Sequence, residues 1–157
     1  MRALQRGSVR VLVDVVREPS TLPGCFSGKL HSARGAADLF RGYRALSNMP
    51  ESKEAFLVLV LDSKHRALGI NLVSLGTLQA SVVHPREVFR PAIALAGAAI
   101  LVCHNHPSGE ADPSHEDQAV TDRLTEAGRL LGIPLLDHLI LGKDLLYSFT
   151  EGRKLAY

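Results

Sequence analysis

Apolar residues along this chain form short runs of strand length and longer stripes with helical spacing. Phe56–Leu61 is a continuous apolar run that ends at Asp62, which is typical of a strand buried on both faces. Leu68–Ser74 follows it as the expected hairpin partner. Further strands are expected at Val9–Val15, Ala80–Val83, Ala98–Cys103, Leu135–Leu141 and Leu145–Phe149.

Helical spacing is clearest between Ser114 and Leu131, where Gly132 and Pro134 provide the stop. The apolar stripe of this helix is Val120, Leu124, Ala127 and Leu131. Two further helices are expected at Ser32–Leu46 and Pro85–Ala96, and a short one in the C-terminal tail. Helices that flank a mixed β-sheet predict an α+β fold, arranged as a three-layer α/β/α sandwich.

The composition is that of an ordinary globular protein, with 46% hydrophobic and 22% charged residues. No apolar run reaches the ~18 residues of a membrane span, and the N-terminus lacks a signal-peptide pattern. Cys25 and Cys103 do not make a disulfide framework, so we expect a reducing compartment, the cytoplasm. Residues 1–50 are expected to form an N-terminal extension or appendage, and residues 51–157 the main domain.

The charge balance gives little support to nucleic acid as a partner. The formal net charge is +2, and the chain has no Trp, three Tyr and five Phe. Avid nucleic-acid binders carry a clearer excess of basic residues, and single-strand binders supply aromatic rings on which bases stack. The arginines near the N-terminus are interpreted as part of a solvated face.

The most informative segment runs from His104 to Asp117. His104 and His106 are two apart, so at strand spacing both imidazoles point to the same face and can reach one ion. Asp117 adds a carboxylate, and two imidazoles with one carboxylate suit Zn²⁺. Three protein ligands leave a fourth tetrahedral position for water, which is typical of a catalytic zinc site. We therefore predict a zinc site at His104, His106 and Asp117.

Each part of this segment also has a simpler interpretation. A His-x-His pair by itself often lies on a surface strand. Ser114 and Asp117 have the spacing of a capping box, in which a serine and an acid three residues later satisfy the backbone at the start of a helix. Capping and metal binding are compatible, because Ser114 and Asp117 can cap the helix in the metal-free chain and the Asp117 carboxylate can coordinate the metal when it is bound.

The spacing His-x-His-Pro, six residues, Ser, two residues, Asp resembles the JAMM motif of JAB/MPN-type metalloenzymes. The flanking residues are similar to those of the RadC family. They are Glu54-Ala55-Phe56, Leu61-Asp62, Gly76-Thr77-Leu78, His84-Pro85-Arg86-Glu87-Val88-Phe89, Ser108-Gly109 and Asp137-His138. The resemblance covers about residues 52–150 and implies the cytidine-deaminase-like MPN/JAB fold. Residues 1–50 do not resemble the helix-hairpin-helix region that RadC-like proteins usually carry.

Hydrolysis at such a site needs a proton acceptor, and Glu54 is the predicted general base. It shares a strand face with Phe56, and it falls where the RadC-like pattern places its glutamate. Ser114 is predicted to donate its hydroxyl to a developing oxyanion. The competing acids are Glu51, Glu87, Glu110 and Glu116. Other residues of interest are Asn105, Ser108 and His115 as groups that orient the ligands, and Cys103 and His138 as residues of the core.

These residues predict a zinc-dependent hydrolase of the JAMM type, a metallopeptidase or isopeptidase with a peptide or protein substrate. Two alternatives stay open at this point. One is the DNA-repair or recombination role that the RadC name suggests, and the other is a non-catalytic interaction module. The sequence does not indicate the substrate or the oligomeric state.

Overall fold

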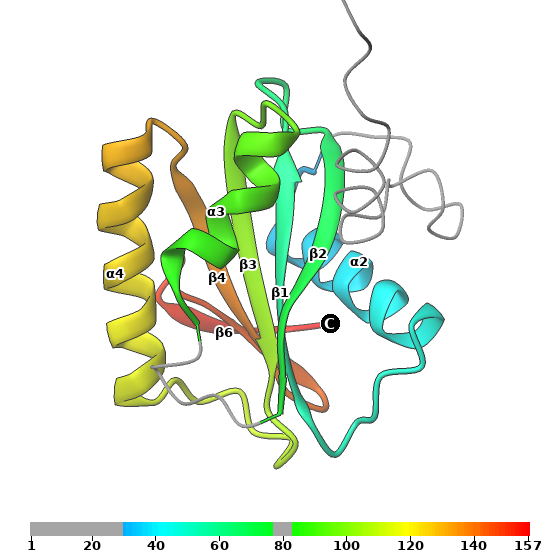
Figure 1. The fold of residues 1–157 in the computed structure, drawn as a ribbon. Helices are drawn as coiled ribbons and strands as arrows, with labels where there is room; N and C mark the ends of the chain where they lie inside the picture. Colours follow the sequence, from blue (N-terminus) through cyan, green and yellow to red (C-terminus); the bar gives the residue numbers. More distant parts are fainter. Residues whose placement is uncertain (1–29, 77–82) are drawn as a thin grey trace, which may run out of the picture.

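The computed structural model describes residues 30–76 and 83–157. The strand expected at Val9–Val15 and most of the one at Ala80–Val83 lie outside these residues, and Val83 itself is not in a strand. Figure 1 shows the described part as one sheet with helices on both sides. The helices are α2 (Ala33–Leu46), α3 (Pro85–Ala94) and α4 (His115–Leu131). The strands are β1 (Glu54–Leu61), β2 (Ala67–Gly76), β3 (Ala99–Asn105), β4 (Leu135–Leu141), β5 (Leu145–Ser148) and β6 (Arg153–Ala156).

The sheet has the strand order β2-β1-β3-β4-β5-β6. Only β3 and β4 pair in parallel within the described chain, and α4 makes the crossover between them. All other neighbours are antiparallel, with β1 set against β3 so that Phe56 lies opposite His104. The sheet is therefore mixed, as expected from the sequence.

Alternate residues of β1 enter two different cores. Phe56, Val58 and Val60 pack with residues of α3 and α4 on one face. Leu57, Leu59 and Leu61 pack with residues of α2 on the other face, and Figure 1 shows α2 on the side of the sheet away from α3 and α4. Burial on both faces explains why this strand is a continuous apolar run instead of an alternating one. The α+β fold and its three layers are confirmed.

Helix α4 begins and ends where its capping residues stand. Ser114 is the N-cap, and Gly132 ends the helix in the left-handed conformation with φ 69°. Val120 and Leu124 are buried as predicted, but Leu131 is 48% exposed, so its place in the predicted stripe is wrong. Gly128 lies on the buried face instead, and a Cβ at this position would come within 2.6 Å of the Ile133 carbonyl oxygen, which favours glycine.

Two further expectations need correction. The tail forms strand β6 instead of a short helix, because residues 153–156 complete a hairpin with β5. Helix α3 ends at Ala94 instead of Ala96, which has a positive φ of 50°. The division at residue 50 stays a prediction, and α2 on its N-terminal side packs against the sheet as one of the three layers. In the described residues, no helix is long and apolar enough to cross a bilayer.

Candidate metal centre

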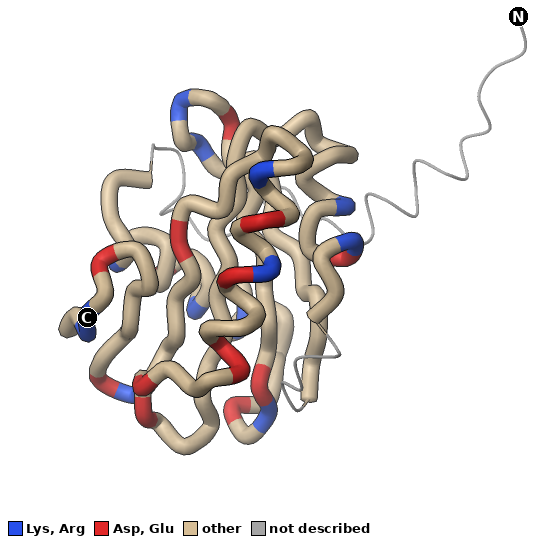
Figure 2. The backbone as a smooth tube through the Cα atoms, turned by 90° about the vertical axis from the view of Figure 1, so that its left-hand side faces the viewer, with Lys and Arg blue, Asp and Glu red and all other residues tan. Residues whose placement is uncertain are grey.

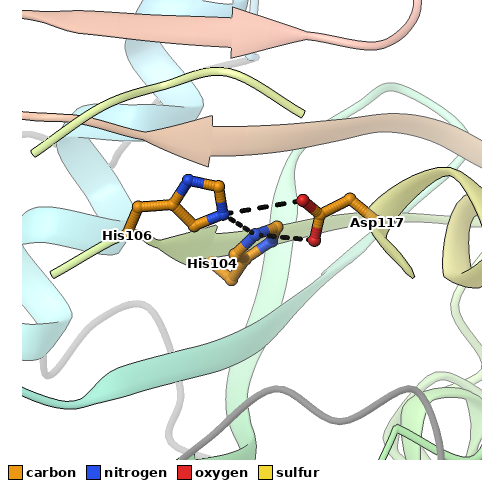
Figure 3. Close-up of side chains that lie close together, drawn as sticks. All are labelled: His104, His106 and Asp117. Carbon is orange, nitrogen blue, oxygen red and sulfur yellow. Dashed lines mark hydrogen bonds and ion pairs between the residues drawn. The ribbon is translucent and has the colours of Figure 1, made fainter. Parts of the chain in front are cut away.

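The fold brings His104, His106 and Asp117 together at one end of the parallel pair of strands. His104 is near the end of β3, on the face that carries Ile100 and Val102 toward α4. His106 follows the strand, and its backbone N–H donates to the Leu141 carbonyl at the end of β4. Asp117 is in the first turn of α4. Figure 3 shows the two imidazoles and the carboxylate facing one another.

The distances among these groups suit a tetrahedral ion. The two Nε2 atoms are 3.0 Å apart, and His104 Nε2 is 3.0 Å from Asp117 Oδ1. His106 Nε2 is 3.6 Å from Asp117 Oδ2. Ligands about 2.0 Å from a tetrahedral zinc are separated by roughly 3.3 Å, so the observed separations bracket that value. The His-His-Asp cluster could therefore hold a metal ion.

A chain of hydrogen bonds fixes which nitrogen of His104 faces the cluster. The Thr121 hydroxyl donates to the Asp117 backbone carbonyl at 2.7 Å, so its oxygen can only accept from His138 Nδ1, 2.7 Å away. A neutral His138 then has a bare Nε2, which accepts from His104 Nδ1 at 2.9 Å. The proton of a neutral His104 is thus held on Nδ1, and the Nε2 lone pair points into the cluster.

A backbone carbonyl orients His106 so that, as in His104, its Nε2 atom faces the cluster. Its Nδ1 lies 2.9 Å from the Glu110 carbonyl oxygen, which can only accept a hydrogen bond. Nδ1 therefore carries the proton, and the Nε2 atom of the neutral ring is free to bind an ion. Two Nε2 lone pairs and a carboxylate thus converge on one point, an arrangement that a cation stabilises.

Burial and charge act in opposite directions in this cluster. Burial by itself raises the pKa of the Asp117 carboxyl. Hydrogen bonds from His104, His106 and Ser114, together with the charge of His104, outweigh this effect and hold the pKa below its usual range. The hydrogen bond to Asp117 raises the pKa of His106. Burial, together with the charge of His104, lowers the pKa of His138 well below its usual range, so this ring is neutral. The Asp117 carboxylate is therefore ionised and available as a ligand.

Ser114 and Asp117 form the complete capping box that their spacing predicted. The Asp117 N–H donates to Ser114 Oγ at 3.1 Å, and the Ser114 N–H donates to Asp117 Oδ2 at 2.8 Å. The Ser114 hydroxyl also donates to Asp117 Oδ2 at 2.7 Å. The hydroxyl proton thus points at the carboxylate in this arrangement, and its predicted donation to an oxyanion requires it to turn away.

Glu54 opens β1 at the same end of the sheet. It lies on the strand face of Phe56, which pairs with His104 in β3, so extension of the register places Glu54 beside His106. The negative charge of Glu54 also contributes to the raised pKa of His106. The structure thus brings the predicted general base next to the ligand cluster, while its catalytic role stays a prediction.

Asn105 holds the start of β1 in place. Its Oδ1 accepts from the Ala55 N–H at 2.9 Å, and its Nδ2 donates to the Lys53 carbonyl at 3.1 Å. These two backbone groups flank Glu54 in the chain, so Asn105 holds the backbone on both sides of that glutamate. Its role in orienting a metal ligand stays a prediction.

The remaining sequence candidates fall into three groups. Ser108 Oγ accepts from the Glu110 N–H at 3.3 Å, and so shapes the loop whose carbonyl orients His106. His115 is exposed and, within the described chain, takes part in none of the hydrogen bonds that hold the cluster. Cys103 and His138 are buried as expected, with 1% and 0% exposure.

Two parts of this site escaped the sequence analysis. The contact of His138 with His104 was missed because the two residues lie 34 positions apart and meet only through the β3–β4 pairing. Thr121 was missed although it lies one helical turn after Asp117, a spacing that places both on one face of α4.

A mixed sheet between helices, with two histidines and an aspartate at one end, defines a candidate metal-binding α+β domain. The family model described as RadC-like JAB domain matches residues 31–155. The chain belongs to this family, and the resemblance drawn from the motif residues is confirmed.

Similar curated proteins carry the name UPF0758 protein. One from Alkaliphilus metalliredigens is 52% identical over 99 residues, 63% of this chain and 43% of the relative. One from Methanosarcina mazei is 51% identical over 101 residues, 64% of this chain and 44% of the relative. One from Staphylococcus carnosus is 48% identical over 125 residues, 79% of this chain and 53% of the relative. This chain thus matches about half of the length of these relatives, or slightly less.

Proposed function

We propose that this protein is a zinc-dependent hydrolase of the JAMM type that cleaves a peptide or isopeptide bond. The observation that carries the proposal is the convergence of two histidine Nε2 atoms and one carboxylate, with the proton of each neutral ring held on the opposite nitrogen. Three ligands leave a coordination position open, which is the arrangement of catalytic zinc sites. The reducing cytoplasm, expected from the cysteine content, is its proposed compartment.

His104, His106 and Asp117 would hold the ion, and the proposed roles of the other residues follow from their positions. A bound Zn²⁺ supplies a Lewis acid that makes water more acidic and polarises a carbonyl group. Glu54, beside His106, accepts the proton of the attacking water and returns it to the leaving amine. Ser114 turns its hydroxyl from Asp117 toward the carbonyl oxygen that becomes negative.

The proposal is tested first by metal content. Protein purified without chelator should contain about one zinc per chain by elemental analysis. His104→Ala and Asp117→Ala should lose it, whereas His115→Ala should keep it, because that exposed histidine from the same segment is not one of the three clustered residues. Zinc retained by both ligand variants would exclude this site as the metal centre.

Activity is tested separately, on internally quenched peptides and on peptides joined through a lysine side chain. Cleavage should require zinc and should be absent from the ligand variants. Stoichiometric zinc in a protein that cleaves neither class would leave a metal-binding module and overturn the hydrolase assignment.

DNA is the alternative partner that the RadC name suggests. Figure 2 shows Lys and Arg positions mixed with Asp and Glu positions on the face that it presents. Phosphate-driven binding needs a coherent basic surface. We therefore keep the peptide or protein substrate as the proposed partner.

A further inference from the structure

A cavity of about 580 Å³ adjoins the metal centre and shares His106 with it. Arg41 and Arg44 of α2 line one side, and residues 105–109 and 141–143 line the other. This volume lies in the range of pockets that bind small ligands or segments of peptide. The shared wall places whatever occupies the cavity next to the ligand cluster.

The cavity has an unbalanced charge. In the part of the chain that the structure describes, its lining contains three cationic side chains, Arg41, Arg44 and Lys143, against one acidic side chain, Glu51. Among the described residues, none of these three cations forms an ion pair within 4.0 Å, although five other acidic side chains pair with Lys, Arg or His. Uncompensated positive charge in a concave site attracts an anion.

Arg44 has a donor left over. Its Nη2 donates to the Pro50 carbonyl at 3.2 Å, but its Nε is buried and has no partner among the described residues. Burial lowers the pKa of Arg44, and the charge of Glu51 offsets only part of that effect. Arg44 lines the cavity, and a carboxylate bound there fits a planar guanidinium group with two parallel hydrogen bonds.

The opposite wall is held in place before any ligand arrives. The Lys143 N–H donates to the Gly109 carbonyl at 2.8 Å, and a Cβ on Gly142 would lie only 2.6 Å from that oxygen. Gly109 itself has φ 84°, a conformation that favours glycine. Arg41 is likewise fixed, with its guanidinium carbon 3.1 Å from the centre of the Tyr157 ring. Fixed walls reduce the entropy lost on binding.

We propose that this cavity binds an acidic segment of the peptide substrate, with a carboxylate held by Arg44 and Arg41. The peptide part of this proposal rests on the proposed function. Met49 and Leu141 make part of the lining apolar, and none of the described lining residues is Phe, Tyr or Trp. This lining favours a peptide over single-stranded nucleic acid, whose bases need rings on which to stack. The site therefore selects substrates that carry a carboxylate close to the bond cleaved.

The test uses the metal-loaded protein and two labelled peptides that differ only in Glu or Gln at the same positions. The Glu peptide should bind about tenfold or more tightly than the Gln peptide in fluorescence anisotropy. Arg44→Gln should remove about tenfold of that affinity, and Lys143→Gln should remove a smaller, salt-sensitive part. Arg34→Gln is the matched control, because Arg34 is exposed on the same helix and does not line the cavity.

Zinc content and melting temperature are measured for every variant. If Arg44→Gln fails to fold, the exposed Lys143→Gln and the Arg41→Gln variants still decide the outcome. Equal binding of the two peptides, or an equal loss in Arg34→Gln, would overturn the proposal. So would binding that disappears in Asp117→Asn but persists in Arg44→Gln, because the metal would then hold the carboxylate.

An oligonucleotide of matched charge supplies the last comparison. Tighter binding of the oligonucleotide than of the Glu peptide, lost in Arg44→Gln, would assign the cavity to phosphate and reject the peptide. Selective peptide binding without any cleavage would reject the hydrolase and keep the cavity assignment, so the two proposals fail separately.

Discussion

His104 Nδ1 lies 2.9 Å from His138 Nε2, between two adjacent parallel strands and almost fully shielded from solvent. A histidine that binds a metal through one nitrogen usually has the other nitrogen held by a hydrogen-bond acceptor. Here that acceptor is a second histidine, itself held by Thr121. Proton placement at the metal centre is therefore controlled from β4 and α4.

The first prediction concerns His138. His138→Phe fills the same aromatic surroundings, since Phe56 and Phe149 contact this ring, but it cannot accept from His104. We expect zinc affinity to fall by about 10- to 100-fold. His138→Gln should keep more of the affinity, because its side-chain oxygen can accept the same bond. Competition with a chelator of known affinity measures both, and equal affinities of wild type and His138→Phe would contradict this role.

The second prediction isolates Thr121. Thr121→Val keeps the shape of the side chain but removes the oxygen that accepts from His138, so His138 loses its preferred proton position. Zinc affinity should fall by a smaller factor than in His138→Phe. Thr125→Val is the control, because Thr125 is one turn further along α4 and donates to the Thr121 carbonyl, whereas the hydroxyl that contacts His138 is that of Thr121. Equal zinc affinities in the two valine variants would reject the relay.

The third prediction assigns the general base. Glu54→Gln keeps the size of the side chain and can still form hydrogen bonds, but it cannot accept a proton. The variant should retain zinc and lose cleavage on any substrate that the wild type turns over. Glu87→Gln, one of the competing acids, should remain active because Glu87 is on α3 and does not line the cavity. Unchanged turnover in Glu54→Gln would move the role to another acid.

The fourth prediction separates capping from catalysis at Ser114. If this serine only caps α4, Ser114→Ala should cost about 1 kcal/mol of stability and Ser114→Asp should restore it, with no effect on the reaction. If it also donates to an oxyanion, both variants should lose on the order of 10²–10³ in turnover. We expect the second result, measured as turnover and melting temperature at constant zinc content. A fully active Ser114→Asp protein would reduce Ser114 to a helix cap.

The fifth prediction is weak and nonspecific DNA binding. The net charge of +2 and the lack of Trp leave little to contact a phosphate backbone or a stacked base. Any affinity should fall steeply with salt in a filter-binding titration. A sub-micromolar complex that persists at ~200 mM salt would contradict this prediction and favour DNA over a peptide as the partner.

The sequence alone determined the local parts of this protein. His104, His106, Ser114 and Asp117 lie within one strand–loop–helix unit, so the spacing of these residues fixes which side chains can meet. The same holds for the capping box and for the Gly132 stop, where one residue type supplies the required hydrogen bond or backbone conformation. The continuous apolar run of β1 likewise predicted a strand that is buried on both faces.

Only the tertiary structure decided the contacts that cross the sheet. The placement of Glu54 beside His106, the support of His104 by His138, and the cationic cavity between α2 and residues 105–109 depend on strand order and register. Strand β6 also formed where a helix was expected, because its partner β5 offered a free edge. Spacing along the chain fixes local geometry, but pairing between distant segments depends on the packing of the whole sheet, which periodicity does not encode.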